Sequence, residues 1–372
     1  MSRTPLSRPT LLPGLPRIWR APRTLQLGLD PARAMLLDLP DVQAARLLDL
    51  LDGSRPERLA LARAGSLGLR PTEATALLDT LYAAGLVVPA RSLFPPAMPA
   101  RLTSEAAALA FSGSEATPAR TLRRRAAARV VVTGAGRLAP GVAVALAEAG
   151  AGHVHPDLTG TVTLHETPGG PLTEADIGEP RAEAVAAAMA RSAPGTRTRP
   201  VRQGTACLVI QLGHGDPAAP APAAGGLRHR PRLTATVREG SVSVGPLFLP
   251  HSGPCPECLA RHRADRGAPW PQAPVAEAGK AVEPCGVATL LSAVARITHE
   301  ALTFLDGGTP ETLGAEIVIT TPGRTRRRTW VPHPACRCGR RAGGLRPEGA
   351  GALIASDRIL AHSRPNKRRE SG

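Results

Sequence analysis

The sequence predicts an α/β protein in which a small α+β domain of the winged-helix type precedes a Rossmann-type domain with a structural zinc knuckle. Three observations support this fold class. The first ninety residues combine strand-like and helical patterns, a buried strand runs into a glycine-rich turn near residue 134, and four cysteines form two close pairs. A chain of 372 residues has room for about two such domains.

Residues 1–90 are expected to form the first domain. Short apolar or alternating runs separated by turn-forming residues predict three strands, at 17–20, 25–29 and 35–39. Apolar residues at helical spacing, with capping and terminating residues, then predict three helices, at 41–53, 56–64 and 71–85. A last short strand is expected at 86–88. This order of elements is the pattern of a winged helix.

A winged helix can bind DNA, so this function stays open as one alternative. The third helix argues against it, because its exposed positions include Glu73, Asp79 and Thr80 rather than arginines facing phosphates. We therefore do not expect a nucleic-acid partner.

Two segments are expected to lie outside the domains. Residues 91–128 are interpreted as a connector with one short helix at 104–111, and its basic run at 123–125 as a solvated helix face or, second, an anion site. Residues 346–372 are basic and are expected to form a disordered tail.

A Rossmann-type unit is predicted to begin the second domain, at 129–345. The strand RVVVTGAG leads into Gly134 and Gly136, the next segment is helical, and a second strand ends at Asp157. In such units the helix N-terminus faces a phosphate and the acidic residue holds a ribose hydroxyl. The alternative is that these glycines only permit close packing of strand and helix.

The cysteine pairs predict a zinc site, because zinc in structural sites takes four ligands at tetrahedral corners. The ligands would be Cys255, Cys258, Cys336 and Cys338. Each pair lies among turn-forming residues, as a metal-binding loop requires. The second pair is CxC rather than CxxC. A disulfide or two unrelated pairs of buried thiols are the alternatives.

The two other cysteines, Cys207 and Cys285, suggest no bridge. Cys207 lies in a strand-like run and is expected to be a core residue. The chain start lacks the apolar segment of a secretory signal, and no stretch reaches the length of a membrane span. We therefore expect a reducing cytoplasm, where paired cysteines favour metal over disulfide.

The net charge of +16 comes almost entirely from arginine, since only Lys280 and Lys367 are lysines. Such a charge suits a nucleic-acid partner or an acidic peptide. Aromatic residues make up only 2% of the chain, which leaves no surface on which bases would stack.

Several stretches together resemble the ThiF-like adenylyltransferases of the ubiquitin-activating superfamily. They are GAGRLAPGVAVALAEAGAGHV, DIGEPRAEAVAAAMARSAPG, VGPLFLPHSGPCPECLARHRADRGAPWP and VPHPACRCG. More closely, the region at 129–340 resembles the divergent members that accompany azole-forming YcaO cyclodehydratases in thiazole/oxazole-modified microcin (TOMM) biosynthesis. The N-terminal region is similar to the RiPP recognition element of those systems, a winged-helix domain that binds peptides.

The ThiF resemblance implies site residues. It implies nucleotide phosphates at Gly134, Gly136 and Arg181, ribose at Asp157, and zinc on the four paired cysteines. Cys285 lies near the place where sulfur-accepting members carry a thioester cysteine; a buried residue at a helix start is the preferred interpretation of it.

Departures from the family argue against ATP chemistry. Active members have an asparagine and an arginine that contact the ATP phosphates soon after the second strand, and residues 159–175 contain neither. Arg181 stands where a lysine is usual, and a planar guanidinium is not equivalent to a compact ammonium. We expect no catalysis by this chain, and keep an active adenylyltransferase as the alternative.

The resemblance implies a protein that binds the leader of a precursor peptide and presents it to a YcaO-type cyclodehydratase. The leader would add a strand beside residues 35–39 and place apolar side chains against the third helix. The contacting residues would be Met35, Leu36, Leu37, Leu77, Leu78 and Leu81. A homodimer is also expected.

Overall fold

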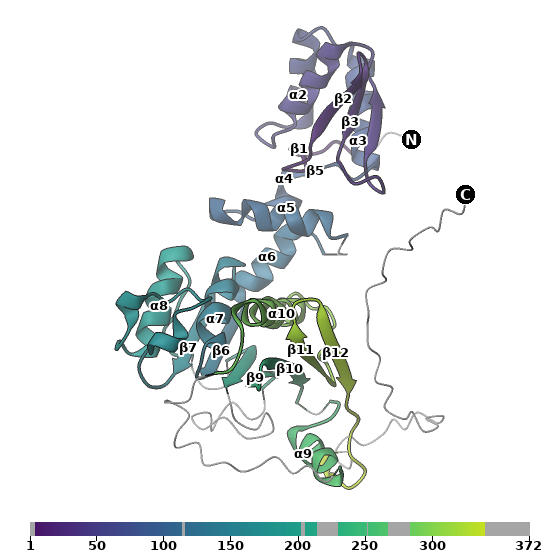
Figure 1. Cartoon of the computed structure of the whole chain (residues 1–372). Coiled ribbons are helices and arrows are strands. Elements are labelled where there is room, and N and C mark those ends of the chain that lie inside the picture. Colours follow the sequence, from purple (N-terminus) through teal and green to yellow (C-terminus); the bar gives the residue numbers. More distant parts are fainter. Residues whose placement is uncertain are drawn as a thin grey trace, which may run out of the picture. The chain divides into compact units, whose positions relative to one another are not determined.

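The computed structural model describes residues 4–113, 116–201, 205–213, 230–250, 252–266 and 283–338 (Figure 1). The chain divides into two compact units, Met1–Arg124 (unit 1) and Arg125–Gly372 (unit 2). Each unit has its own hydrophobic core. The tail expected at 346–372 lies outside the described residues.

Unit 1 contains the three strands that the sequence predicts. They form an antiparallel sheet of order β2-β3-β4, from β2 (Arg17–Ala21), β3 (Thr24–Leu27) and β4 (Met35–Asp38). The last predicted strand is β5 (Val87–Pro89), and it pairs with β1 (Pro9–Leu11), which the sequence did not predict. Because β4 is at the end of this order, one edge of β4 is unpaired by any described strand.

The predicted helices follow in the expected order. The first is a 3-10 turn, η1 (Val42–Arg46), that continues into α1 (Leu47–Leu50), and the others are α2 (Glu57–Ser66) and α3 (Pro71–Ala83). Asp41 caps the first one by accepting a hydrogen bond from the Gln43 backbone N–H at 3.1 Å.

The core of unit 1 lies between the sheet and α3. Leu25, Leu27 and Leu37 from the strands share one apolar cluster with Leu78 and Leu81 from α3. Since side chains alternate along a strand, the neighbour of Leu37, Leu36, falls outside this core and is 62% exposed.

The connector region holds more helix than expected. It contains α4 (Ala90–Leu93), η2 (Ala100–Leu102), α5 (Thr103–Phe111) and α6 (Pro118–Ala127). Leu102, Ala106 and Leu122 form a small cluster of their own. The boundary between the two compact units falls within α6, after Arg124.

Unit 2 is built on a seven-stranded sheet of order β12-β11-β10-β9-β8-β6-β7. The four strands from β7 to β9 run parallel, and the pairings from β9 to β12 are antiparallel. The strands are β6 (Arg129–Gly134), β7 (His153–Leu158), β8 (Leu208–Gly213), β9 (Arg232–Arg238), β10 (Ser241–Phe248), β11 (Ala315–Thr321) and β12 (Arg324–Thr329).

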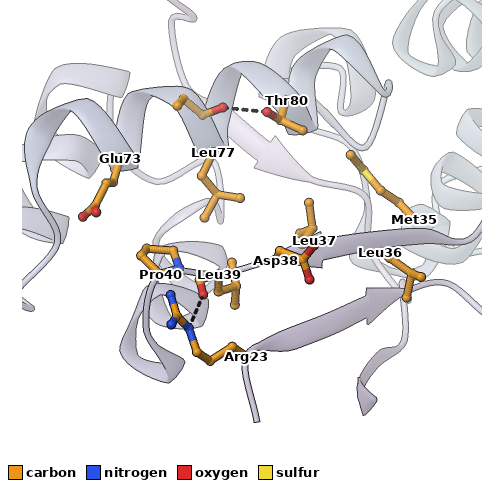
Figure 2. Close-up of a pocket in the computed structure, with 11 residues that line it drawn as sticks. Arg23, Met35, Leu36, Leu37, Asp38, Leu39, Pro40, Glu73, Leu77 and Thr80 are labelled. Carbon is orange, nitrogen blue, oxygen red and sulfur yellow. Dashed lines mark hydrogen bonds between the residues drawn. The ribbon is translucent and has the colours of Figure 1, made fainter. Parts of the chain in front are cut away.

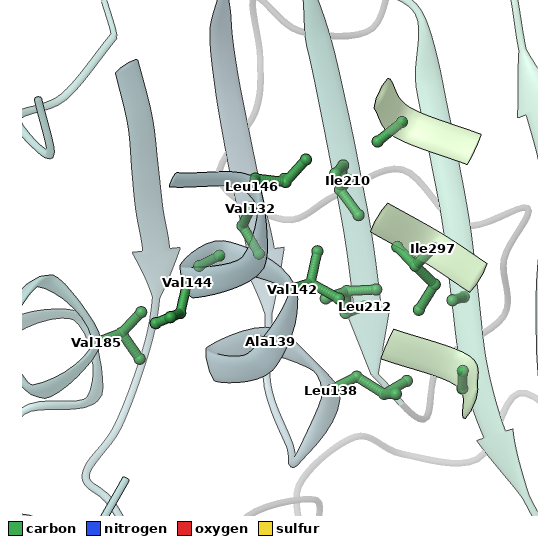
Figure 3. Packing of buried hydrophobic residues seen from close by; sticks show 14 of the residues in the cluster. Val132, Leu138, Ala139, Val142, Val144, Leu146, Val185, Ile210, Leu212 and Ile297 are labelled. Carbon is green, nitrogen blue, oxygen red and sulfur yellow. The ribbon is translucent and has the colours of Figure 1, made fainter. Parts of the chain in front are cut away.

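Three helices pack together on this sheet: α7 (Leu138–Glu148), α8 (Arg181–Ser192) and α10 (Val287–Leu305). Strand β6, helix α7 and strand β7 form the predicted Rossmann-type unit. The apolar layer between helices and sheet is shown in Figure 3, and includes Val132, Val142, Leu146, Ile210 and Ile297. No helix in the described part of the chain is both long and apolar enough to cross a membrane.

Two expectations about single residues were wrong. Arg125 is 3% exposed rather than solvated, because its guanidinium donates to the Asp306 carboxylate through Nε at 2.9 Å and Nη2 at 2.7 Å. Cys207 is exposed rather than in the core, since it precedes the first residue of β8. Arg123 and Arg124 are exposed, as expected.

Removal of the Asp306 carboxylate is expected to destabilise unit 2. The variant Asp306→Ala leaves the buried Arg125 charge without this partner, which should lower the free energy of unfolding by about 3 kcal/mol. The exposed carboxylate of Glu311, which pairs with Arg296 at 2.6 Å, provides the matched control. Urea unfolding should show a change of about 0.5 kcal/mol or less for Glu311→Ala. Equal effects of the two variants would contradict this account.

Candidate functional site

A groove of about 670 Å³ runs between β4 and α3 in unit 1 (Figure 2). Its walls are the outer edge of the sheet and one face of the helix. The lining residues are Arg23, Met35, Leu36, Leu37, Asp38, Leu39, Pro40, Glu73, Ala76, Leu77 and Thr80. A groove beside an unpaired strand edge offers backbone hydrogen bonds and side-chain pockets together, which is the geometry of strand addition.

The predicted peptide contacts divide between the groove and the core. Met35, Leu36, Leu37 and Leu77 line the groove. Leu78 and Leu81 do not, because both are fully buried in the core. The helix phase explains this difference: residues 73, 76, 77 and 80 form one stripe of α3, and residues 74, 78 and 81 form the stripe that faces the sheet.

Charged groups at the groove are held in place by local hydrogen bonds. The Arg23 side chain donates to the Leu39 carbonyl at 3.1 Å, and Asp38 accepts from the Thr24 hydroxyl at 2.9 Å. A hydrogen bond from Arg70 lowers the pKa of Glu73, so its carboxylate stays ionised. The groove therefore combines an apolar floor with a few fixed polar groups.

The glycine-rich turn lies at the carboxyl end of β6 and has the conformation that only glycine adopts readily. Gly134 has φ +118°, and a Cβ atom there would lie 1.7 Å from the Leu212 carbonyl oxygen of β8. Gly136 has φ +92°. Close packing of β6 against β8 is thus sufficient reason for Gly134, a strand–strand contact rather than the strand–helix packing that the sequence offered as the alternative.

A carboxylate of this chain occupies the space beside Gly136. A Cβ atom at Gly136 would lie 1.8 Å from Oε1 of Glu283. The other carboxylate oxygen of Glu283 accepts the Arg137 backbone N–H at 2.9 Å, at the start of α7. A helix N-terminus is where such folds bind a phosphate. Here the position is already filled by a buried side chain, since Glu283 is 8% exposed.

The Arg137 guanidinium, also buried, lies at the same turn. It donates to the carbonyl oxygens of Cys285 at 2.6 Å and Pro168 at 3.0 Å. These two bonds connect the glycine-rich turn with the segments that precede α10 and follow η3 (Leu164–Glu166).

Asp157 and Arg181, the other two predicted nucleotide contacts, differ in their surroundings. Asp157 lies near the carboxyl end of β7, directly opposite Thr133 and therefore close to the glycine-rich turn. Arg181 is buried and forms a bidentate ion pair with Glu166, with Nε at 2.8 Å and Nη2 at 3.0 Å. It also donates to the carbonyl oxygens of Thr159 and Thr161. Its charge is therefore already neutralised within the protein.

Cys285 has the environment of an unreactive thiol. Burial raises its pKa; nearby Arg137 acts in the opposite direction and Glu283 acts in the same direction. A thiol with a raised pKa is a poor nucleophile. This placement matches the interpretation of Cys285 as a buried residue at the start of α10.

Sequence reasoning missed Arg137, Glu166 and Glu283. Glu166 lies in the segment 159–175 that departs from the family, and Glu283 lies two residues before Cys285, but no motif marks either glutamate. Glu283 meets a residue 146 positions away, and such a pairing depends on the packing of α10 rather than on spacing along the chain.

The four paired cysteines lie together, as predicted. Three Sγ–Sγ distances are 3.7 Å for Cys255 and Cys258, 3.6 Å for Cys255 and Cys336, and 3.2 Å for Cys258 and Cys338. A disulfide requires about 2.05 Å, so none is present in this cluster. A tetrahedral zinc ion with Zn–S bonds of about 2.3 Å separates its sulfurs by about 3.8 Å. The cluster fits zinc.

The local structure around the first cysteine pair directs both of its sulfur atoms toward the second pair. Cys255 is the N-cap of α9 (Pro256–Asp265), which places Cys258 in its first turn. Burial raises the pKa of the Cys258 thiol, but the backbone N–H of His333 and the other hydrogen bonds lower it by more. Burial raises the pKa of Cys255 and Cys338. Metal binding therefore has to displace protons from these thiols.

A second group of potential metal ligands, His262, Asp265 and His333, lies near the cysteines. The Ala335 backbone N–H donates to Nδ1 of His333 at 3.1 Å, so Nε2 carries the proton and donates to Asp265 at 2.7 Å. With Nε2 protonated, His333 is a hydrogen-bonding partner of Asp265. It stabilises the loop that carries the second cysteine pair.

No protein-family model and no curated protein matches this sequence. Solved structures do match the fold. E. coli MccB with ATP aligns with a TM-score of 0.55 at 14% identity, over 88% of this chain and 98% of MccB. The microcin C7 biosynthetic enzyme MccB in complex with N-formylated MccA gives 0.54 at 14% identity, with the same coverage.

A further solved structure, PaaA, aligns with a TM-score of 0.52 at 16% identity, over 68% of this chain and 91% of PaaA. At these identities the likeness concerns the fold. The chain therefore shares the overall fold of MccB, over 88% of its own length.

The cysteine cluster predicts one zinc ion per chain. Cys258→Ser, at a fully buried ligand, should abolish stoichiometric zinc and lower the melting temperature, because metal binding contributes to folding. The exposed Cys207 supplies the control: Cys207→Ser should keep both properties. Metal analysis and thermal unfolding are the measurements, and a Cys258→Ser protein with full zinc content would refute the assignment.

Proposed function

We propose that this protein binds the leader of a ribosomally made precursor peptide and presents it to a YcaO-type cyclodehydratase in thiazole/oxazole-modified peptide biosynthesis. Unit 1 is the peptide-binding domain, of the winged-helix type. Unit 2 is a ThiF-like scaffold that carries zinc and performs no ATP chemistry. The groove beside the free edge of β4 is the observation that carries this proposal.

In this proposal the leader binds as a fourth strand next to β4. Its backbone pairs with β4, and every second side chain turns toward α3. Met35 and Leu77 are half-buried and form the apolar contact, with Leu37 as the floor. Leu36 is exposed on the other face of the strand, where it meets the alternate leader side chains. Affinity comes from backbone hydrogen bonds and selectivity from these pockets.

Two internal carboxylates support a scaffold role for unit 2. Glu283 takes the hydrogen bond that a nucleotide phosphate would take at the start of α7, and Glu166 neutralises Arg181. Phosphoryl chemistry needs cationic groups aimed at the charge that develops on phosphates. In unit 2 the guanidinium of Arg181 is already paired, and Glu283 already occupies the N-terminus of α7. The site therefore offers a nucleotide neither a free cation at Arg181 nor a free helix N-terminus.

Zinc on the four cysteines would cross-link α9 to the segment after β12. This would hold a surface on which the cyclodehydratase and a second copy of the chain dock. The partner enzyme supplies the ATP chemistry, and the assembly acts in the cytoplasm. Binding the leader raises the effective concentration of the modifiable part of the peptide at the partner's active site.

The structural neighbours are compatible with a peptide substrate. MccB has been crystallised with the peptide MccA, and it is described as a microcin C7 biosynthetic enzyme. A precursor peptide is the ligand class that we transfer to this chain, on the strength of the groove in unit 1.

An ATP-dependent adenylyltransferase is the second candidate function. The observation in its favour is the fold shared with MccB, which has been crystallised with ATP, together with the positive φ angles of Gly134 and Gly136 in the glycine-rich turn. Adenylation of a carboxylate would require Glu283 to leave the start of α7.

The groove residue Leu77 provides the test of leader binding. Leu77→Asp should weaken binding of the leader encoded beside the gene at least about tenfold, because a charge would replace an apolar contact. Thr75→Asp adds the same charge to an exposed position of α3 outside the groove lining, and should keep the affinity. Fluorescence anisotropy with labelled leader is the measurement. If the leader does not bind to the wild-type protein, either alone or with the partner enzyme, the proposal is refuted.

Pyrophosphate exchange separates the two candidate functions. With ATP and precursor peptide, the wild-type protein should show no exchange. Glu283→Ala should bind ATP at least about tenfold more tightly than wild type, since it vacates the anion position, and still show no exchange because Arg181 remains paired. Glu174→Ala, at an exposed glutamate of the same unit, is the control and should match wild type. Exchange by the wild-type protein would establish the second candidate.

A further inference from the structure

The edge strand of the large sheet is strongly basic. β12 ends the strand order of unit 2, and among the described strands it pairs only with β11 (Figure 1). Its sequence RTRRRT contains four arginines and no acidic residue. All six residues are exposed except Arg328, which is half-buried. The strand therefore presents the exposed charges of Arg324, Arg326 and Arg327 beside backbone groups that no described strand pairs.

The arginines occupy both faces of β12. Arg324, Arg326 and Arg328 lie on one face at intervals of about 6.8 Å, and Arg327 lies on the other. Arg326 is opposite Val318 of β11, so the neighbouring strand offers it no carboxylate. Within the described residues, the Arg324 and Arg326 side chains make no hydrogen bond or ion pair.

Two contacts hold the carboxyl-terminal end of this basic strand. The Arg328 guanidinium lies 4.7 Å from the centre of the buried Trp330 ring, and Arg327 donates to the Glu311 carbonyl at 3.4 Å. The nearest acidic residue across the strands, Glu316, is buried and accepts a hydrogen bond from Ser243. Its charge is therefore not available to Arg324 or Arg326 at the surface.

We propose that β12 is a docking strand for an acidic, extended segment of a partner protein. The segment would pair with the free edge of β12 and place carboxylates at alternate positions, where they meet the exposed Arg324 and Arg326. The spacing of alternate residues is the same on both strands, so each arginine can meet one carboxylate. Guanidinium groups bind carboxylates through two parallel hydrogen bonds. This inference does not depend on leader binding by unit 1.

Three other uses of the strand fit less well. Protection of a sheet edge needs only a few charges, and four arginines still attract an acidic strand. Pairing with β12 of a second copy would bring eight arginines together. Nucleic acids are recognised through base stacking as well as charge, and the aromatic residue next to this strand, Trp330, is 5% exposed.

The test uses the full-length protein and a fluorescein-labelled peptide in which glutamate and threonine alternate. Arg326→Glu should weaken its binding at least about tenfold at low ionic strength, because one attraction becomes a repulsion. The matched control is Arg123→Glu, which makes the same charge change at an exposed position of α6 and should change the affinity less than about threefold. Backbone N-methylation of alternate peptide residues leaves the peptide charge unchanged but removes the N–H groups that would pair with β12. It should therefore abolish binding.

Each other outcome overturns the proposal. Failure of the wild-type protein to bind the acidic peptide means that the arginines only protect the edge. Equal losses for Arg326→Glu and Arg123→Glu mean that the peptide responds to the net charge of the chain. Tighter binding of a single-stranded oligonucleotide assigns the strand to nucleic acid. Circular dichroism of both variants checks that they fold, and Arg324→Glu provides a second position if Arg326→Glu does not.

Discussion

The hydrogen bond between the Glu283 carboxylate and the start of α7 is the contact on which the interpretation of unit 2 depends. It joins the segment before α10 to the glycine-rich turn after β6. Without a side chain at Gly136 the carboxylate can approach the backbone, and a helix N-terminus stabilises its negative charge. The same features that bind phosphates in related folds therefore serve here as an internal link between two helices. The glycines are explained without a nucleotide.

Periodicity imposes a similar constraint on unit 1. In β4, alternation sends Leu37 into the core and Leu36 to the surface; in α3, Leu78 faces the sheet and Leu77 faces the groove. Neighbouring apolar residues thus have different tasks, one in folding and one at the surface. In each pair one leucine completes the core and the other adds an apolar side chain to the lining of the groove. A groove with this origin persists without a ligand, because its floor is the core itself.

Local patterns in the sequence were enough for the strands and helices at 17–88 other than β1, for the Rossmann-type unit and for the cysteine cluster. Helix caps, glycine stops and alternating strands depend on near neighbours, and two cysteine pairs among turn residues need only be brought together. The partners of Arg125, Arg181 and Glu283 could not be predicted from local patterns. Each of these charged groups contacts a residue that only the tertiary fold brings close. For a related reason Leu77, Leu78 and Leu81 of α3 were all predicted to contact the peptide. Their spacing identifies an apolar face of the helix, but not the part of that face that the sheet covers.

Burial distributes the charges unevenly between interior and surface. Five glutamates are buried in the described part of the chain, against three arginines: Glu57, Glu166, Glu283, Glu300 and Glu316, and Arg125, Arg137 and Arg181. Several of these acids accept backbone N–H groups, as Glu57, Glu283 and Glu300 do, so part of the buried negative charge is stabilised by the backbone. The surface therefore carries more positive charge than the composition alone requires. At β12 this excess coincides with a free strand edge, and charge and backbone together select for an acidic polypeptide.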